Sequence, residues 1–179
     1  MMESSTVLNN NSLAFIGLCN EYCQTLESAR ETECDDFIAA MLRLLPRIYI
    51  TASDLKIDDL GLEEPYIDGR LDEDYYDSIR RSIENLLGPD DTYLEVFEED
   101  MKYSDTPIGA SIAEGISDIF QVLYNFITMV REAPSETIDR ALVAVKDDFD
   151  SYWSQKLCNL LRPLNHLRYK VSDEEEDDF

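Results

Sequence analysis

Apolar residues recur at intervals of three and four along most of the 179-residue chain. Between residues 12 and 30, for example, the recurring positions include Phe15, Cys19, Tyr22 and Leu26. Because an α-helix has about 3.6 residues per turn, this spacing places them on one face of an amphipathic helix. The chain has only six glycines and six prolines, which leaves few of the turns that a strand-rich fold needs. The sequence therefore predicts an all-α fold, a single-domain helical bundle.

The apolar stripes predict about five main helices, at about residues 12–30, 33–49, 72–87, 107–130 and 135–167. We expect Thr32 to cap the second helix. Pro46 should kink or end that helix near Leu45, because proline lacks an amide donor and crowds the preceding turn. Pro107 suits the first turn of the fourth helix. The long C-terminal helix is expected to be kinked near Pro163.

Two connections interrupt these helices. Residues 51–71 contain glycine, proline and several acids without any period, which predicts a long acidic loop after the second helix. Residues 90–105 are ambiguous, because Tyr93–Phe97 fits a short strand, a helical turn or an ordered loop, and we assign the stretch as a loop with an apolar anchor. We expect residues 1–170 to form the single helical domain and residues 171–179 to be a disordered acidic tail.

The net charge of the chain is −24, from 39 acids and 15 Lys or Arg. A small soluble domain usually carries a net charge of magnitude roughly 2–8, so solubility alone does not explain the excess. The charge is also segregated, with −22 on residues 1–150, +4 on residues 151–170, which hold no acid, and −6 on residues 171–179. This order describes an acidic body, a basic helix and an acidic tail.

The densest acidic window is residues 54–100, with 17 acids against four Lys or Arg. It favours a non-enzymatic protein–protein interaction module whose partner is a basic protein. A special version of this hypothesis is a nucleic-acid mimic, in which carboxylates take phosphate-like positions. Direct nucleic-acid binding is not expected from a body of this charge. The oligomeric state stays open.

Metal and cofactor chemistry finds no support in the sequence. His166 is the single histidine, and the four cysteines form no C-x-x-C pair. Eight pairs of acids stand three residues apart, but chance alone gives about 8 in a chain this rich in acids. We therefore predict no metal and no cofactor, and expect the cysteines to be buried, reduced thiols.

Targeting signals are not evident in the sequence. The first residues lack the basic and apolar regions of a signal peptide, and no run reaches the ~18 apolar residues of a membrane span. These features predict a cytoplasmic protein that is not in the membrane.

Three stretches resemble a known family. They are FIGLCNEYCQTLE at 15–27, PIGASIAEGISDIFQVLYNF at 107–126 and YWSQKLCNLLRPLNHLRY at 152–169. They are similar to an all-helical family of Bacteroides-type bacteria that is catalogued as a domain of unknown function, and the likeness extends from about Leu13 to Tyr169. The resemblance implies a helical fold and a bacterial, cytoplasmic origin, and it carries no established activity.

The residues at which the chain matches the pattern of this family become the candidate binding residues. They are Glu21, Tyr22, Asp118, Gln121, Trp153 and His166. The alternative to an interaction module is an enzyme or small-molecule binder, with a pocket between the first, fourth and fifth helices that draws on these residues.

The basic helix from Trp153 to Lys170 is a further candidate recognition surface. Its cations also complement the negative C-terminal end of a helix dipole, which is a purely structural explanation for them. We also consider that the acidic tail lies along this helix as a counter-charge.

Overall fold

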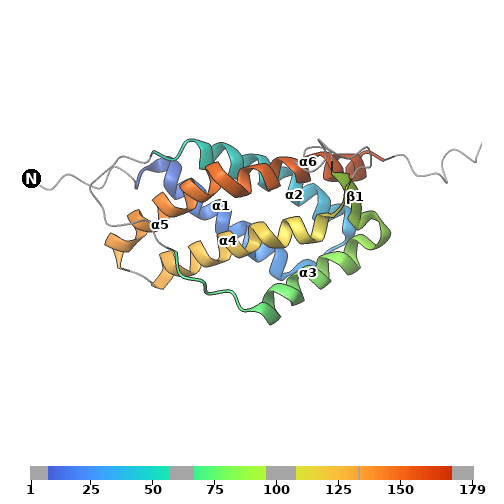
Figure 1. Ribbon diagram of the computed structural model, residues 1–179, viewed down its shortest axis with the longest axis horizontal. Coiled ribbons are helices and arrows are strands. Elements are labelled where there is room, and N and C mark those ends of the chain that lie inside the picture. Colours follow the sequence, from blue (N-terminus) through green and yellow to red (C-terminus); the bar gives the residue numbers. More distant parts are fainter. Residues whose placement is uncertain (1–7, 57–66, 96–107, 133, 171–179) are drawn as a thin grey trace, which may run out of the picture.

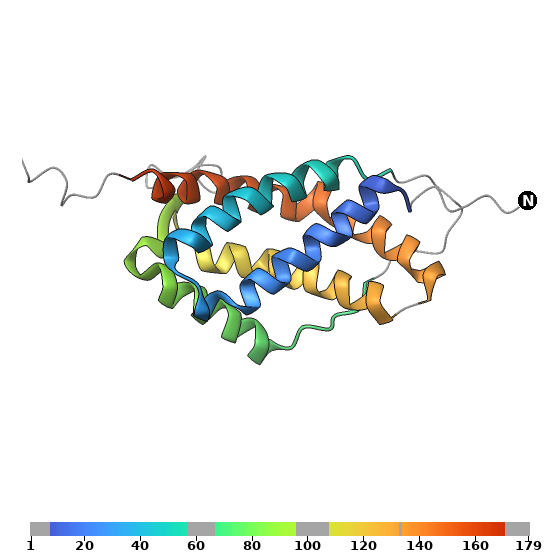
Figure 2. The same ribbon diagram turned by 180° about the vertical axis from the view of Figure 1, so that it is seen from behind.

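The computed structural model describes residues 8–56, 67–95, 108–132 and 134–170. Its helices and strands follow one another along the chain as α1 (Asn10–Glu27), the 3-10 turn η1 (Ala29–Glu31), α2 (Cys34–Ser53), α3 (Glu73–Leu87), the 3-10 turn η2 (Gly88–Asp91), β1 (Thr92–Glu95), β2 (Ile108–Ser111), α4 (Ile112–Glu132), α5 (Ser135–Asp148), the π-helical turn η4 (Phe149–Trp153) and α6 (Ser154–Arg168). The predicted all-α bundle is confirmed (Figures 1 and 2).

Side chains just before the helices satisfy the free amides of their first turns. Asn9 and Ser12 form a capping box at the start of α1, in which each side chain accepts a hydrogen bond from the backbone amide of the other. Asp72 accepts a bond of 2.7 Å from the Tyr75 amide in α3. Asp91 accepts one of 2.7 Å from the Ala113 amide in α4. Such caps each stabilise a helix by about 1 kcal/mol.

The hydrophobic core surrounds α4, which lies in the middle of the bundle and contacts α1, α3, α5 and α6 (Figure 1). Its buried side chains are Ile112, Ala113, Ile116, Ser117, Ile119, Phe120, Leu123, Phe126, Ile127 and Met129. An aromatic cluster joins three elements, because the Phe15 ring of α1 lies 5.5 Å from the Phe126 ring of α4 and 6.4 Å from the Trp153 ring of η4, between ring centroids. Burial of rings this large dominates core stability.

Proline does not end α2, which was one of the two outcomes that the sequence predicted for Pro46. The helix runs from Cys34 to Ser53 with Pro46 inside it. The apolar stripe continues past the proline, where Ile48 and Ala52 are fully buried, so tertiary packing holds the helix together despite the lost amide bond. Thr32 is not the N-cap either, because Glu33 occupies that position and its side chain makes no capping bond.

The C-terminal helix contains an interruption that the sequence did not predict. It is the π-helical turn η4 at Phe149–Trp153, whereas α6 continues through Pro163, where the sequence predicted a kink. The turn brings both end residues, Phe149 and Trp153, into the core with ring centroids 4.6 Å apart. An inserted residue of this kind re-phases a helix so that the faces before and after it both stay buried.

The stretch assigned as a loop contains a strand. β1 pairs with β2 in antiparallel register, with Tyr93 opposite Ala110 and Leu94 opposite Gly109. The fourth helix accordingly begins at Ile112 rather than near Pro107. Pro107, residues 57–66 of the predicted acidic loop and the tail at 171–179 lie outside the described residues.

Gly115 marks a close contact between α4 and α6. A methyl carbon added there would lie 2.8 Å from Leu160 Cδ2. We predict that Gly115→Ala lowers the free energy of unfolding by about 1–2 kcal/mol, because overpacking outweighs the gain in helix propensity. Urea denaturation measures the change.

Gly17 is the matched control, since it also lies in a helix but no atom comes within 4 Å of an added methyl carbon. Gly17→Ala should raise the free energy of unfolding by about 0.5–1 kcal/mol. Equal stabilisation by both substitutions would contradict the close packing of α4 against Leu160.

Candidate functional site

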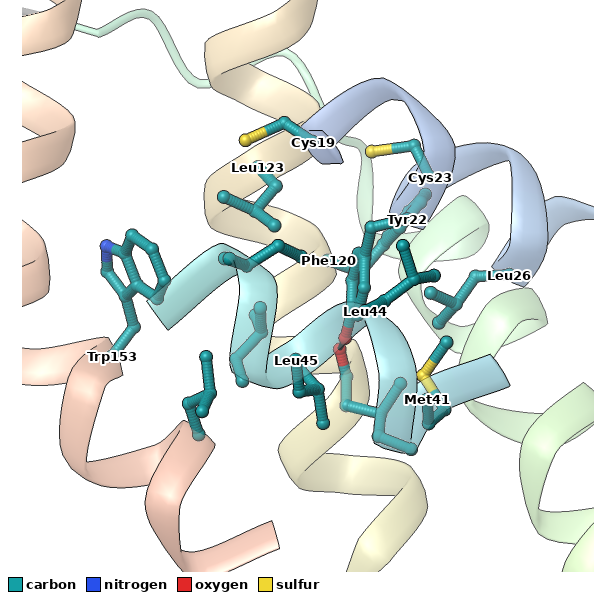
Figure 3. Packing of buried hydrophobic residues seen from close by; sticks show 14 of the residues in the cluster. Cys19, Tyr22, Cys23, Leu26, Met41, Leu44, Leu45, Phe120, Leu123 and Trp153 are labelled. Atoms are coloured by element: carbon teal, nitrogen blue, oxygen red, sulfur yellow. Dashed lines mark hydrogen bonds between the residues drawn. The ribbon is translucent and has the colours of Figure 1, made fainter. Parts of the chain in front are cut away.

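Two of the six predicted site residues lie in the hydrophobic core (Figure 3). Tyr22 and Trp153 are both 0% exposed. The Tyr22 hydroxyl donates to the Ile116 carbonyl oxygen at 2.7 Å, and the Trp153 Nε1–H donates to the Val145 carbonyl oxygen at 3.2 Å. Each side chain thus has its polar atom bonded inside the core, as buried polar groups require, and neither reaches the surface.

Two others are exposed on separate helices. Glu21 lies on α1, and Gln121 lies on α4. Gln121 lines a shallow cavity of about 280 Å³, together with Asn125 and Asp148. The Asn125 side-chain oxygen accepts bonds of 2.8 Å from the amides of Arg70 and Leu71, so it fixes the segment that leads into α3.

Asp118 is the centre of a partly buried polar cluster between α3, α4 and α6. Its carboxylate accepts a hydrogen bond of 2.6 Å from the Tyr76 hydroxyl and one of 3.0 Å from the Lys156 ammonium. The Lys156 nitrogen also lies 5.3 Å from the centre of the Tyr152 ring, within cation–π range. The cluster thus joins three helices through one carboxylate.

The cluster changes the protonation of its members. Burial and the hydrogen bond to Asp118 raise the pKa of Tyr76 well above its usual value. Burial lowers the pKa of Lys156, but the hydrogen bond and the charge of Asp118 outweigh this, so the pKa of Lys156 is raised overall. Both groups therefore stay protonated at neutral pH and donate to Asp118, an arrangement that suits a structural lock better than proton transfer.

His166 lies elsewhere, ten residues beyond Lys156 along α6, or about 15 Å at the rise of a helix. It is exposed and lines a groove of about 350 Å³ between η2, β1 and the end of α6. Arg162 and Lys170 line the same groove. The predicted residues therefore do not share one cavity, and the pocket expected to draw on all of them is not formed by the described residues.

Sequence reasoning identified the acid-free stretch around these cations but not the groove itself. The spacing of Arg162, His166 and Lys170, four residues apart, is the signal that places them on one side of a helix. The opposite wall, which includes Tyr93 and Leu94 of β1, could not be assigned because the strand was not predicted.

Exposed carboxylates form a second charged region on two segments, η1 with the start of α2 and the start of α3. We call it the acidic face and define it by the exposed carboxylates of residues 27–36 and 72–74, which are Glu27, Glu31, Glu33, Asp35, Asp36, Asp72, Glu73 and Asp74. Arg30 joins η1 to the middle of α3, because its side chain donates to Ser82 Oγ at 2.9 Å and to Ser78 Oγ at 3.1 Å.

The cysteines differ from one another in accessibility. All four are free thiols, but only Cys19 and Cys23 are buried, whereas Cys34 is half-buried and Cys158 is exposed. The prediction of buried thiols is therefore wrong for Cys158, which lies on the outer side of α6. Burial and the charge of Glu27 raise the pKa of Cys23 to about 12, so the Cys23 thiol is a packing group and not a nucleophile at neutral pH.

Two further searches of the described residues bear on function. In the part of the chain that the structure describes, no three His, Cys, Asp or Glu side chains gather as ligands for a metal ion. Likewise, none of the helices described has the length and apolar character required to cross a membrane.

These features define a class: a single-domain, all-α bundle with a partly buried polar cluster, a groove lined by cations and an acidic face. The chain belongs to the family described as a domain of unknown function, DUF5063, whose pattern matches residues 6–170. This membership confirms the resemblance seen in the sequence.

A solved structure is also similar. Protein BF1032 from Bacteroides fragilis is 26% identical in sequence and superposes with a TM-score of 0.76, over 92% of this chain and 96% of that chain. Among curated proteins, no relative matches the chain.

The Asp118 cluster yields a prediction. Asp118→Asn should lower the free energy of unfolding by about 1–3 kcal/mol, because the Lys156 ammonium then lies partly buried without a carboxylate partner. A double-mutant cycle with Lys156→Met should give a coupling energy of about 1 kcal/mol or more.

The matched control is the exposed pair of Lys170 and Asp90, whose charged atoms lie 3.5 Å apart. A cycle with Lys170→Met and Asp90→Asn should give a coupling energy near zero and at most about 1 kcal/mol. Equal coupling in the two cycles would show that the Asp118 cluster does not lock the helices.

Proposed function

We propose that this protein is a non-enzymatic interaction module that binds a basic protein partner through its acidic face. The observation that supports this proposal best is the lack of neutralisation there. Glu31, Glu33, Asp35 and Asp36 are exposed, and none of them forms an ion pair with a described residue. At a net charge of −24, repulsion between the carboxylates destabilises the folded chain. A bound basic partner would reduce this repulsion.

The arrangement of charges elsewhere supports the same proposal. On the rest of α3, Arg80 forms ion pairs with Asp77 at 3.4 Å and Glu84 at 2.6 Å. Those carboxylates are therefore partly neutralised within the helix. Glu73 and Asp74, one turn earlier, are exposed and form no ion pair with a described residue. Of the acids on α3, the two that form no ion pair with a described residue therefore lie at its start.

The acidic face is also held in a fixed shape. Arg30 joins η1 to α3 through Ser78 and Ser82. The end of α1 lies beside the start of α3, and there burial and the nearby Glu27 carboxylate raise the pKa of Tyr75 to about 12. A rigid array of charges loses little conformational entropy on binding, which favours specific recognition.

The location and the partner class follow from the sequence. In this proposal the protein acts in the cytoplasm, binds no nucleic acid directly and requires no metal or cofactor. The alternative of an enzyme remains a prediction from the sequence. The Asp118 cluster does not favour it, because Tyr76 and Lys156 stay protonated and hold three helices together.

Charge reversal tests the proposal. The probe is a synthetic peptide of about 20 residues rich in Lys and Arg, titrated into the full chain in a calorimeter at low and at physiological salt. Glu31→Lys combined with Asp74→Lys should weaken binding about tenfold, because several exposed charge pairs of about 0.2–1 kcal/mol each are lost or reversed.

The control carries the same change in net charge at the other end of the bundle. Asp54 ends α2 and Asp147 lies near the end of α5, and both are exposed; the neighbouring Lys146 Nζ lies 3.4 Å from the Ser53 carbonyl oxygen, which places them near one another. Asp54→Lys with Asp147→Lys should weaken binding less than about twofold. Equal weakening by the two variants would mean that only net charge matters, and the acidic face would not be a binding site.

A further inference from the structure

The groove between β1 and α6 combines an apolar floor with a line of cations. Its floor includes Ile112, which is fully buried, together with Pro163 and Leu167. Its outer wall includes Leu94 of β1, which is 62% exposed. At about 350 Å³, the groove falls in the size range of sites that hold small molecules. An apolar cavity with a few polar groups at one side is the usual form of such a site.

Three basic side chains form one row along this cavity. Arg162 and His166 lie on α6, and Lys170 follows its end, so the three are four residues apart and about 6 Å from one to the next. Arg162 and His166 form no ion pair with any described residue. Lys170 faces Asp90 at 3.5 Å, and both side chains are about half exposed, at 47% and 49%. Such an exposed pair is weak enough to exchange for a ligand.

The helix dipole explains only part of this row. The negative end of a helix attracts cations within its last turn, and α6 ends at Arg168. His166 and Lys170 are close enough to benefit. Arg162 lies almost two turns before the end of the helix, so its place in the groove requires another explanation.

The wall opposite the cations is fixed in place. The Asp91 carboxylate accepts hydrogen bonds from the Ser111 hydroxyl at 2.6 Å and from the Ala113 amide at 2.7 Å. It therefore joins η2, β2 and the start of α4. Both of its oxygens already accept hydrogen bonds from these donors. Among the described residues that line the groove, Asp90 is the one acid, and it already faces Lys170. The groove is preformed, and positive groups exceed negative ones in it.

From this combination we propose that the groove binds a small molecule that carries a carboxylate or a phosphate on an apolar body. The anionic group lies against Arg162 and His166, which offer charge-assisted hydrogen bonds. The apolar body lies on Ile112, Pro163 and Leu167. This site is independent of the acidic face, so either proposal can fail without the other.

The test uses two fluorescent probes that differ in one group. The first is 8-anilinonaphthalene-1-sulfonate, which joins an anion to an apolar ring system, and the second is N-phenyl-1-naphthylamine, which has the same rings without the sulfonate. We expect the full chain to bind the anionic probe at least about tenfold more tightly than the neutral one, since a charge-assisted hydrogen bond is worth about one order of magnitude in affinity.

Two exposed residues allow a matched pair of variants. Arg162→Gln combined with His166→Gln should weaken binding of the anionic probe about tenfold and leave the neutral probe unchanged. Arg168→Gln is the control, because Arg168 is exposed on the same helix and does not line the groove. It should change the affinity less than about twofold. Equal effects of both variants, or equal affinity for both probes, would overturn the proposal.

The proton NMR resonances of the single histidine show whether the probe binds beside it. The chain contains only His166, so the imidazole region of a proton NMR spectrum holds one resonance pair. Addition of the anionic probe should shift it, and an unmoved resonance at saturating probe would place binding elsewhere and contradict the site.

The acidic tail of this chain is the competing occupant. A full-length variant in which the acids at 173–178 become amides separates the two cases. If the groove is open to a small anion, this variant and the unaltered chain should bind the anionic probe equally. If only the variant binds, the tail is the natural occupant and the proposal of a small-molecule site fails.

Discussion

The burial of α4 on several sides is the constraint on which the remaining structure depends. Its side chains contact α1, α3, α5 and α6, and the Phe126 ring lies beside Phe15. The same helix supplies Asp118 to the polar cluster and begins at the amide bonded to Asp91. The Asp118 cluster and the groove are therefore fixed in position by elements that pack against α4.

Acidic and basic side chains lie on different segments of the bundle. Carboxylates gather around η1 and the start of α3, whereas the acid-free segment at 151–170 supplies the cations of the groove. The Asp118–Lys156 pair, with the charged atoms 3.0 Å apart, joins a carboxylate of α4 to a cation of this segment. Opposite charges on separate faces allow one small protein to present two surfaces with different binding preferences.

The period of the apolar residues was enough to predict the helices, because burial of one stripe against the core decides where a helix forms. It was not enough to place their interruptions. Pro46 is tolerated because Ile48 and Ala52 are buried beyond it, and the turn at Phe149–Trp153 arises because both rings enter the core. The pairing of Tyr93 with Ala110 joins residues far apart in sequence, which no local pattern reveals.

The residues of the candidate sites were also predicted only in part. The sequence predicted the acid-free stretch from Trp153 to Lys170 as a recognition surface and His166 as a candidate residue, but it did not single out Arg162 and Lys170. Tyr22 and Trp153 occur in the same stretches of sequence as the exposed residues, but the bonds to Ile116 and Val145 that satisfy them in the core depend on tertiary structure. A polar aromatic residue fits equally well in a core and in a groove, so sequence alone does not separate these places.

Native-state hydrogen exchange tests the central position of α4 most directly. If α4 is the buried centre of the fold, the amides between Ile119 and Phe126 should exchange only through global unfolding, with a free energy of exchange equal to that of denaturation. Amides on the exposed side of α3 should exchange faster, through local opening. Exchange in α4 as fast as in α3 would contradict the account.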